Sequence, residues 1–421
     1  MVPGAVLWEA GLAGDPPPKA ALPARADVAV IGGGYTGLAA ARALAKEGAS
    51  VAVLEADRIG GGASGRNGGF VLPGYKAELG AIVRRHGVEV ARRLFEASLA
   101  AIGFVERLVA AEGIACDWHR PGSVTLAAKP GHLAGLRAEQ ELLRRDFGHR
   151  TELLGPQEIQ REIGSAGYHG GLVDPVAGAI QPAQYCRGLA LAAARAGALL
   201  CEGARVTALA RRGPRWTVTT SSGVVEAGEV LVATNGYTGR LMPWLARRVV
   251  PVGSFIVATA PLAPDLAARL IPRGRVMSDT RNLLHYFRLS ADRRLVFGGR
   301  AAFRPEALDE SIRLLGRDLV ALFPELAGVP LEFGWGGTLG FTLDHLPHAG
   351  RVEGIGYALG YGGHGVALAS WLGDQMGLAL GGKGEWPVLS TLRFPPVPLY
   401  QGRPWFLPAA GAYYRLKDWL R

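Results

Sequence analysis

Hydrophobic and polar positions near the start of the chain switch between two periods. Residues 26–31 form a short apolar run, residues 35–46 carry Ala and Leu at helical spacing, and residues 51–54 form a second apolar run. Runs of this length are typical of buried strands, and Gly48 is placed to end the intervening helix. The pattern predicts a strand–helix–strand unit.

The rest of the chain alternates between helical and strand-like patterns. Residues 76–150 and 305–326 are helical in pattern. For residues 204–233 we predict a three-stranded meander followed by a separate buried strand at Val230–Ala233, and for residues 248–300 further strands.

Elements of the kind that bind dinucleotides occur near the start, in the middle and near the end, where residues 356–380 read as strand, glycine loop and helix. We therefore expect one nucleotide-binding domain assembled from separated segments, with a second domain inserted between them.

The composition indicates a globular protein with room for two or three domains in 421 residues. The net charge of +10 comes mostly from arginines spread along the chain. Because they form no basic stripe, we expect no nucleic-acid partner, although the charge also suits a field that attracts an anionic substrate.

Targeting signals are weak. The best apolar candidate for a membrane span, residues 188–201, is short and contains Arg195, and the N-terminus lacks a basic signal region. Cys116, Cys186 and Cys201 are an odd number at unpatterned spacing, which favours a reducing compartment. We expect a cytoplasmic protein without a transmembrane segment.

The motif Gly32-x-Gly34-x-x-Gly37 follows the first strand and opens the helix. Gly32 permits the tight turn, Gly34 lets backbone approach a pyrophosphate, and Gly37 allows close helix–strand packing. The helix N-terminus offers free N–H groups to the phosphates. Glu55, at the end of the second strand, is placed to bind a ribose diol. This context favours a bound adenine dinucleotide over a purely structural glycine turn.

The choice of dinucleotide depends on the remaining sequence. One fingerprint is present and no C-x-x-C motif, which disfavours an enzyme that uses both FAD and NAD(P)H. The glycine-rich stretch 360–371 opens a helix whose N-terminus suits negative charge on a reduced flavin; a plain glycine turn is the alternative. His364 in this stretch is either a catalytic base or a loop histidine that contacts the cofactor or the backbone.

The chain resembles the FAD-dependent amine oxidoreductases of the D-amino-acid oxidase superfamily, which includes glycine and sarcosine oxidases. It is most similar to the γ-glutamylputrescine oxidoreductase-like branch, in which "GASGRNGG" follows the second strand. The resemblance continues through "LVATNGYT", "YFRLSADRRLVFGGR", "WGGTLGFTLDHLPHAGR" and "GYGGHGVAL", and it covers nearly the whole chain.

The resemblance implies an α/β fold with two domains. A Rossmann-like FAD-binding domain would combine residues 1–75, 150–245 and 330–398. An α+β substrate-binding domain with a mixed or antiparallel sheet would combine residues 76–149 and 246–329, and residues 399–421 would form a C-terminal tail.

The resemblance also implies which residues bind FAD. The pyrophosphate would meet Gly32, Gly34, Tyr35, Thr36 and Gly37, and the adenosine ribose would meet Glu55 and Ala56. The ribityl–isoalloxazine side would be lined by Gly62, Ala63, Ser64, Arg66, Asn67, Gly68 and Gly69. Val206, Thr234 and Asn235 would lie near the adenine end, and Gly337, Gly363, His364, Gly365 and Val366 near the pyrimidine edge.

Three departures from the family pattern bear on the chemistry. Relatives with covalently bound flavin attach it through a cysteine near the C-terminal glycine loop or a histidine near the second strand. In this chain no cysteine follows Cys201 and no histidine lies between residues 1 and 85, so we expect non-covalent FAD. Sarcosine-oxidase-like relatives place a lysine over the flavin, but residues 245–330 contain none. A dehydrogenase that uses a quinone-type acceptor or a carrier protein therefore stands beside an oxidase that uses oxygen. Leu339 occupies the place of a carboxylate-binding arginine, which weakens a simple α-amino-acid substrate.

The implied reaction is oxidation of a C–N bond in an amine or amino acid, secondary and γ-glutamylated amines included. Hydride would pass to flavin N5 and the imine would hydrolyse, so geometry matters more than a strong base.

The candidate catalytic residues are Tyr286, Arg288, Trp335 and His364. Alternation puts Tyr286 and Arg288 on one face of a strand and His285 and Phe287 on the other, and the sequence leaves open which face lines the site. Tyr286 would orient the amine and Arg288 would bind an acidic substrate end; ordinary strand positions are the alternative.

Other interpretations stay open. The chain can also be an NAD-dependent dehydrogenase or a non-catalytic FAD-binding subunit. No metal site is expected, because histidines and cysteines lack ligand spacing. In the tail, Tyr413, Leu416 and Leu420 share one helical stripe with basic neighbours. Docking against its own domain is the main interpretation, and contact with a membrane surface or a quinone-type partner is the alternative.

Overall fold

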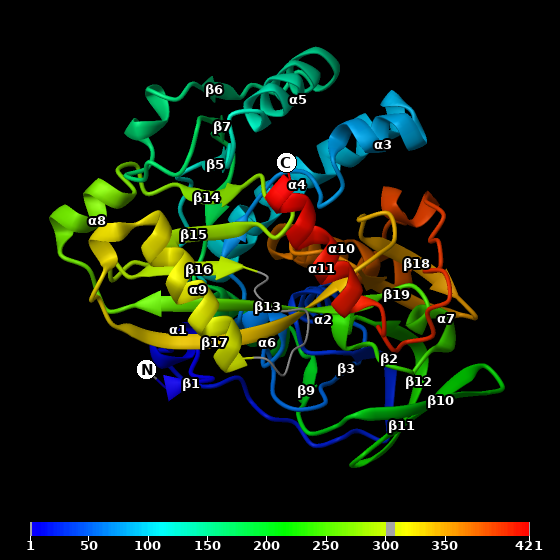
Figure 1. The fold of residues 1–421 in the computed structure, drawn as a ribbon. Coiled ribbons are helices and arrows are strands. Elements are labelled where there is room, and N and C mark those ends of the chain that lie inside the picture. Colours follow the sequence, from blue (N-terminus) through cyan, green and yellow to red (C-terminus); the bar gives the residue numbers. More distant parts are fainter. Residues whose placement is uncertain (1, 300–307, 421) are drawn as a thin grey trace.

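The computed structural model describes residues 2–299 and 308–420 and contains two large β-sheets with helices packed on them (Figure 1). One sheet has eight strands and the other nine. A small two-stranded ribbon pairs β4 (Phe70–Val71) with β8 (Gly178–Ala179). This arrangement confirms the predicted α/β fold class with a mixed second sheet.

The eight-stranded sheet has a parallel centre, in which β9, β3, β2, β12 and β19 lie side by side. Antiparallel strands flank this centre on one side. The strands are β2 (Arg25–Ile31), β3 (Val51–Leu54), β9 (Leu199–Cys201), β10 (Val206–Arg212), β11 (Arg215–Thr220), β12 (Gly223–Val232), β18 (His348–Val352) and β19 (Ile355–Leu359).

The predicted strand–helix–strand unit is β2, α2 (Tyr35–Lys46) and β3, with Val28 opposite Val51 in a parallel ladder. Helix α10 (Gly365–Leu380) packs closely on α2, because glycines stand at the contact. A Cβ added to Gly373 would lie 2.2 Å from the Thr36 carbonyl oxygen. Side chains larger than hydrogen there would therefore push the two helices apart.

The meander prediction was wrong in one respect. Val230–Ala233 is not a separate strand, because β12 runs without a break from Gly223 to Val232. Its first half pairs with β11, while Glu226–Val232 pairs with β2, so one long strand serves both ladders.

The nine-stranded sheet is mostly antiparallel, with parallel pairs at β1–β17 and β5–β14. Helices α8 (Pro264–Leu270) and α9 (Leu308–Leu322) contribute to a core with the buried rings of Phe287, Phe297 and Phe323. The strands are β1 (Val2–Pro3), β5 (Ser123–Leu126), β6 (Glu152–Leu154), β7 (Gly171–Asp174), β13 (Val250–Thr259), β14 (Val276–Asp279), β15 (His285–Leu289), β16 (Leu295–Gly299) and β17 (Leu331–Phe341).

The division into two domains stays a prediction, but four strands are grouped differently in the structure. The nine-stranded sheet includes β1, β6, β7 and β17, whereas the predicted ranges group them with the nucleotide-binding segments. The long β17 pairs with β13 over nearly its whole length, which draws it into this sheet.

Most of the other helices follow the predicted pattern. Residues 76–150 contain α3 (Leu79–His86), α4 (Val88–Glu112) and α5 (His132–Phe147), but β5 interrupts them because Val124 and Leu126 join a sheet core. In the predicted helical segment 305–326, residues 305–307 lie outside the described residues. The remaining elements are α1 (Leu7–Ala10), α6 (Pro182–Arg195), α7 (Pro243–Ala246), α11 (Leu407–Leu420), η1 (Ala63–Gly65), η2 (Glu158–Arg161), η3 (Asn235–Tyr237), η4 (Pro324–Leu326) and η5 (Val388–Thr391).

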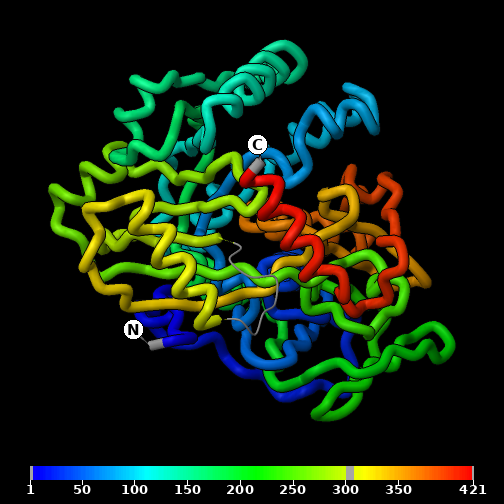
Figure 2. Tube along the Cα trace, in the orientation of Figure 1, coloured from blue at the N-terminus to red at the C-terminus, as the bar shows by residue number. Residues whose placement is uncertain are grey.

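The C-terminal segment, red in Figure 2, runs back over the front of the molecule in this view. Leu407 and Tyr400 pack with Val250, Val252 and Phe341 in a small hydrophobic cluster. The tail therefore packs on its own chain through Tyr400 and Leu407, whereas Tyr413 and Leu416 of the predicted stripe are exposed. Within residues 2–299 and 308–420, no helix has both the length and the apolar character needed to cross a bilayer.

Candidate active site

The carboxyl ends of the parallel strands meet at one edge of the eight-stranded sheet. The backbone ties these ends together: Gly32 N donates to Leu54 O (3.0 Å), Glu55 N to Cys201 O (2.9 Å) and Ala233 N to Ile31 O (2.9 Å). Loops that leave such an edge form the usual ligand crevice of open α/β sheets. Most of the predicted cofactor-binding residues lie in these loops.

The glycine fingerprint forms a tight turn at this edge. Gly32 has φ +108°, and a Cβ there would lie 2.9 Å from the Ala233 carbonyl oxygen. A Cβ on Gly37 would lie 1.9 Å from the Gly32 carbonyl oxygen, so α2 approaches the turn as closely as the motif predicts. Gly34 is the N-cap of α2 and has no side chain to cap the helix. Apart from Tyr35 N, which donates to Ser64 Oγ, the N–H groups of the first turn are therefore available to an anion.

Glu55 helps to shape the turn. Its Oε2 accepts a hydrogen bond from Gly33 N (2.7 Å) and its Oε1 accepts one from Asp57 N (3.0 Å). Each carboxylate oxygen keeps a second lone pair, so Glu55 can still accept from ribose hydroxyls. Ala56 follows directly, and Val206 starts β10 two residues after Ala204, whose N–H donates to Glu55 O (2.8 Å).

The segment Gly60–Phe70, here called the glycine loop, is held in shape by its own polar side chains. Ser64 Oγ accepts from Tyr35 N at the start of α2 (3.0 Å). Asn67 Nδ2 donates to Ser64 O (2.9 Å), Ala63 O (3.2 Å) and the Tyr35 hydroxyl (3.2 Å), and its Oδ1 accepts from Gly69 N (2.8 Å). The Asn67 amide therefore orders the loop from within.

Two tryptophans outside the glycine loop donate hydrogen bonds to its carbonyl groups, and the Arg66 side chain makes a bond within it. Trp335 Nε1 donates to Arg66 O and Trp8 Nε1 donates to Asn67 O, both at 2.8 Å. The two indoles meet edge to face, with ring centroids 6.2 Å apart. Arg66 Nε donates to Gly61 O (2.9 Å). Trp335 is fully buried, and its bond to Arg66 O supports the loop.

Thr234 and Asn235 link the ends of β12 and β19. The hydroxyls of Thr234 and Thr238 are hydrogen-bonded (2.8 Å). Asn235 has a positive φ of 44°, and its Oδ1 accepts from Gly360 N (2.9 Å). This bond fixes the start of the C-terminal glycine stretch beside the end of β12.

The stretch Gly360–His364 turns sharply into α10. Gly363 has φ +100°, and His364 is the N-cap residue, whose backbone N–H donates to Tyr361 O (2.9 Å). The Tyr361 and Thr36 hydroxyls are hydrogen-bonded (2.7 Å), which joins this stretch to α2. Gly365 and the buried Val366 form the first turn of α10, and the His364 side chain does not cap its N–H groups. The N-termini of α2 and α10 thus lie at the same edge.

On strand β15, Tyr286 and Arg288 face the glycine loop. A Cβ on Gly68 would lie 3.1 Å from Tyr286 Cε2, and the Tyr286 hydroxyl is hydrogen-bonded to Ser254 Oγ (3.2 Å). On the opposite face, Phe287 is fully buried in the core, and His285 pairs with Asp279 and Asp318, both at 3.3 Å. The strand therefore presents Tyr286 and Arg288 to the predicted flavin side.

Arg288 lies beneath the loop and is only 4% exposed. It donates to Ile180 O (2.6 Å) and its guanidinium lies over the Trp8 ring, 5.1 Å from the centroid. Burial lowers the pKa of Arg288 to about 10, so the group stays charged at neutral pH. A Cβ on Gly69 would lie 2.9 Å from its Nη2, so the side chain supports the loop.

A cavity of about 250 Å³ opens at the edge of β17, beside the glycine loop. Its wall includes Arg66, Tyr237, Phe255, Gly336 and Gly337. Tyr237 was missed by the sequence analysis, although it stands in the quoted "NGYT". Its hydroxyl accepts from Thr338 N (3.2 Å), and a Cβ on Gly62 would lie 3.1 Å from its ring. Its side chain covers the loop at the mouth of the cavity.

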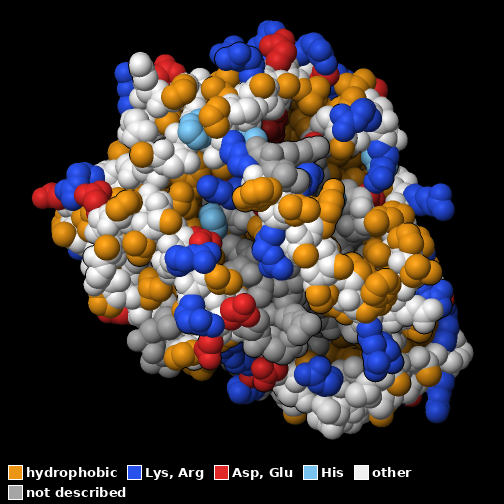
Figure 3. Space-filling view, viewed as in Figure 1, with side chains coloured by type: hydrophobic (Ala, Val, Ile, Leu, Met, Phe, Trp, Pro, Cys, Tyr) orange, Lys and Arg blue, Asp and Glu red, His pale blue; other side chains and the backbone are white. Residues whose placement is uncertain are grey.

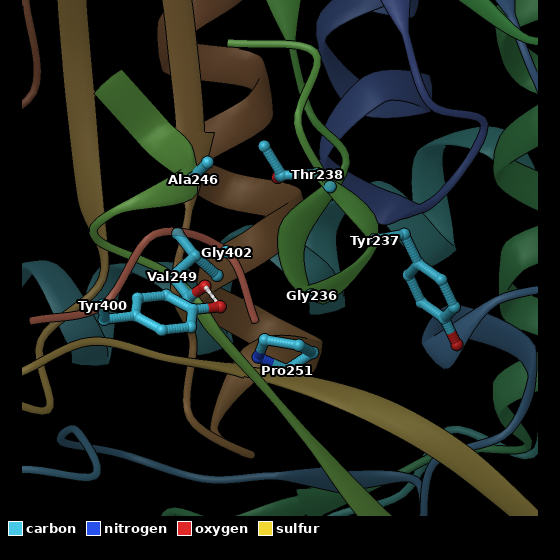
Figure 4. A pocket seen from close by; sticks show the side chains of 9 residues that line it. Gly236, Tyr237, Thr238, Ala246, Val249, Pro251, Tyr400 and Gly402 are labelled. Carbon is cyan, nitrogen blue, oxygen red and sulfur yellow. Dashed lines mark hydrogen bonds between the residues drawn. The ribbon is translucent and has the colours of Figure 1, made fainter. Parts of the chain in front are cut away.

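A smaller cavity of about 130 Å³ lies on the other side of Tyr237 and is shown in Figure 4. Tyr400, whose hydroxyl donates to Val249 O (3.0 Å), Pro251 and Gly402 contribute to its wall. Figure 4 shows the Tyr237 ring pointing away from these residues. The small cavity is therefore separated from the glycine loop by η3.

Lys76 lies beside the C-terminal glycine stretch. A Cβ on Gly362 would lie 3.1 Å from Lys76 Cβ. The sequence search for a lysine covered residues 245–330, whereas the fold brings this one from the segment before α3. The absence of lysine from residues 245–330 therefore does not decide between oxygen and another acceptor.

Open backbone at two glycines fits a flat, extended cofactor. A Cβ on Gly337 would meet only Arg66 Cβ, at 3.8 Å, and one on Gly363 would meet only Leu339 Cδ1, at 3.8 Å. Together with the two helix N-termini and Glu55, these positions provide anion-binding N–H groups, a diol acceptor and bare backbone for a ring. The residues present fit FAD.

Comparison with known proteins decides the family. The family model described as "FAD dependent oxidoreductase" (DAO) matches residues 27–377. The chain belongs to the DAO family of FAD-dependent oxidoreductases. It is therefore an FAD-dependent enzyme, as predicted.

Individual relatives agree with the DAO assignment. The chain is 37% identical over 398 residues to γ-glutamylputrescine oxidoreductase of Escherichia coli (strain K12), covering 93% of this chain and 92% of the relative. It is 34% identical to the probable oxidoreductase OrdL of Haemophilus influenzae, covering 90% and 88%. The fold is similar to the crystal structure of glycine oxidase from Geobacillus kaustophilus, with a TM-score of 0.73, 22% identity, and 90% and 99% coverage. The predicted resemblance is thus confirmed.

Proposed function

We propose that this DAO-family enzyme oxidises a C–N bond of an amine to an imine, which water then hydrolyses to an aldehyde or keto product. The observation that carries the proposal is the cavity at Arg66, Tyr237 and Gly337, because it adjoins the glycine loop and the open backbone that suit a flavin. Bound FAD would supply the hydride acceptor.

The substrate we propose is an amine that carries a remote carboxylate, with γ-glutamylputrescine as the leading candidate. The E. coli relative bears that substrate in its name, and the net charge of +10 suits an anionic group. Leu339 stands where an arginine would bind an α-carboxylate, which favours a carboxylate farther from the nitrogen.

The protein's contribution is mainly orientation and exclusion of water. We propose that the Tyr286 and Ser254 hydroxyls, which are bonded to each other at 3.2 Å, orient the amine, and that Phe255 and Tyr237 exclude water from one side. The neutral amine needs no strong base for this reaction. His364, as the N-cap of α10, is proposed to contact cofactor or backbone, and Arg288 to hold the loop and not the substrate.

We propose that FAD is bound non-covalently, in a cytoplasmic protein whose three cysteines are free and buried. Release of intact FAD by acid precipitation tests whether the FAD is non-covalent.

The electron acceptor is proposed to be oxygen or a quinone-type molecule. The rates at which oxygen and a quinone re-oxidise the reduced flavin distinguish the two acceptors. A role of Lys76 in the oxygen reaction predicts that Lys76→Met slows re-oxidation by oxygen and not by the quinone.

The decisive experiment follows flavin absorbance after anaerobic mixing with a panel of amines. The panel contains γ-glutamylputrescine, putrescine, glycine and N-methylglycine. We expect γ-glutamylputrescine to reduce the flavin at least about tenfold faster than putrescine, because putrescine lacks the carboxylate. If no amine reduces the FAD-loaded protein, it is a non-catalytic FAD-binding subunit. If only NADH reduces it, it is an NAD-dependent oxidoreductase and not an amine-oxidising enzyme.

A further inference from the structure

The inward face of α11 is fixed to the rest of the chain. The Asp418 carboxylate accepts from Asn282 N (2.8 Å), Asn282 Nδ2 (2.7 Å) and Leu283 N (2.9 Å). Lys129 Nζ donates to the backbone carbonyl of Asp418 (2.6 Å), near the C-terminal end of the helix. These bonds set which side of α11 points outward.

The outward face of α11 is apolar. Tyr413, Leu416 and Trp419 are 59%, 54% and 78% exposed, and Trp405, just before the helix, is 69% exposed. Ala412, one helical turn before Leu416, is exposed as well. Surface helices ordinarily turn charged and polar side chains to water, so this arrangement is the reverse of the usual one. Figure 3 shows hydrophobic side chains, coloured orange, gathered over this segment with basic side chains, in blue, beside them.

The described part of the C-terminal segment is mostly basic. It contains Arg403, Arg415 and Lys417 but a single acid, Asp418. That acid is turned inward by its bonds to Asn282 and Leu283. Among the described residues, the outward face of α11 therefore combines aromatic and aliphatic side chains with a positive border, and the segment's one acidic side chain is turned away from it.

We propose that the outward face of α11 binds a membrane surface rich in anionic phospholipid. Trp and Tyr side chains favour the interface between water and hydrocarbon, and Lys and Arg beside them are attracted to anionic headgroups. A second copy of the chain fits this face less well, because a two-fold contact would bring Arg415 and Lys417 of both copies together. The proposal does not depend on which amine is oxidised.

Vesicle flotation of the full-length, FAD-loaded enzyme tests this proposal. We expect the enzyme to float with phosphatidylcholine vesicles that contain phosphatidylglycerol, more weakly with phosphatidylcholine alone, and less as salt rises. Arg415→Gln combined with Lys417→Gln should weaken binding to the anionic vesicles roughly 30-fold, taking about 1 kcal/mol for each charge. Leu416→Ser combined with Trp419→Ser should abolish flotation.

Val224→Ser is the matched control, because Val224 is also exposed, at 49%, but lies on β12. It should float like the wild type, and all variants should keep their FAD and melting temperature. The proposal is overturned if the wild type does not float with anionic vesicles, or if Leu416→Ser with Trp419→Ser floats unchanged. It is also overturned if light scattering shows a dimer that Trp419→Ser dissociates while no vesicle is bound, since a second copy would then cover the face.

Discussion

Replacing Asn67 with Ala should weaken FAD binding through the shape of the glycine loop. The Asn67 side chain makes four hydrogen bonds, and the two shortest join it to Ser64 O (2.9 Å) and Gly69 N (2.8 Å). At about 1 kcal/mol net for each of these two, the ordered loop loses roughly 2 kcal/mol. If only the ordered loop binds FAD, the dissociation constant should rise roughly 30-fold.

The assay is titration of apo-protein with FAD, followed by flavin fluorescence. Asn282→Ala is the matched control: it also removes an asparagine side chain, one bonded to Asp418 at 2.7 Å instead of to the loop. It should leave FAD affinity unchanged. An unchanged FAD dissociation constant in Asn67→Ala would refute the view that this side chain orders the cofactor site.

Three further changes test other parts of the account. Gly337→Ala should fold normally, because its Cβ would meet only Arg66 Cβ at 3.8 Å, yet it should lose FAD affinity or turnover, as measured by flavin titration and steady-state kinetics. Burial alone would lower the pKa of His285. Its hydrogen bonds to Asp279 and Asp318 have the larger effect, so the pKa is raised above 6.5. The stability from this pairing is complete below about pH 6.5 and is lost as pH rises through the raised pKa, so the difference in unfolding free energy between wild type and His285→Gln should shrink in alkaline buffer. Tyr286→Phe should raise KM for the amine several-fold while the FAD dissociation constant stays the same.

The parts of the fold that were predicted correctly depend on local patterns. The unit around α2 follows from two apolar runs and a glycine fingerprint that are close in sequence, and the structure places its helix at the predicted residues. β12 was misjudged because a single strand pairs with β11 along one part and β2 along another, which a local pattern does not reveal.

The site shows the same limit. Arg66 and Asn67 were identified from the motif, but the donors beneath them, Trp8 and Trp335, come from distant segments. Trp8 stands in the N-terminal segment, where no pattern marked it as part of the site. The burial of Arg288 likewise depends on Ile180 and Trp8, so its supporting position became visible only in three dimensions.

The most direct test of the central claim is a single anaerobic turnover of the FAD-loaded enzyme with γ-glutamylputrescine. We predict that the flavin loses its visible absorbance and that one aldehyde and one ammonia appear for each flavin reduced. A flavin that stays oxidised with this and every other amine would contradict the assignment of amine oxidation to this enzyme.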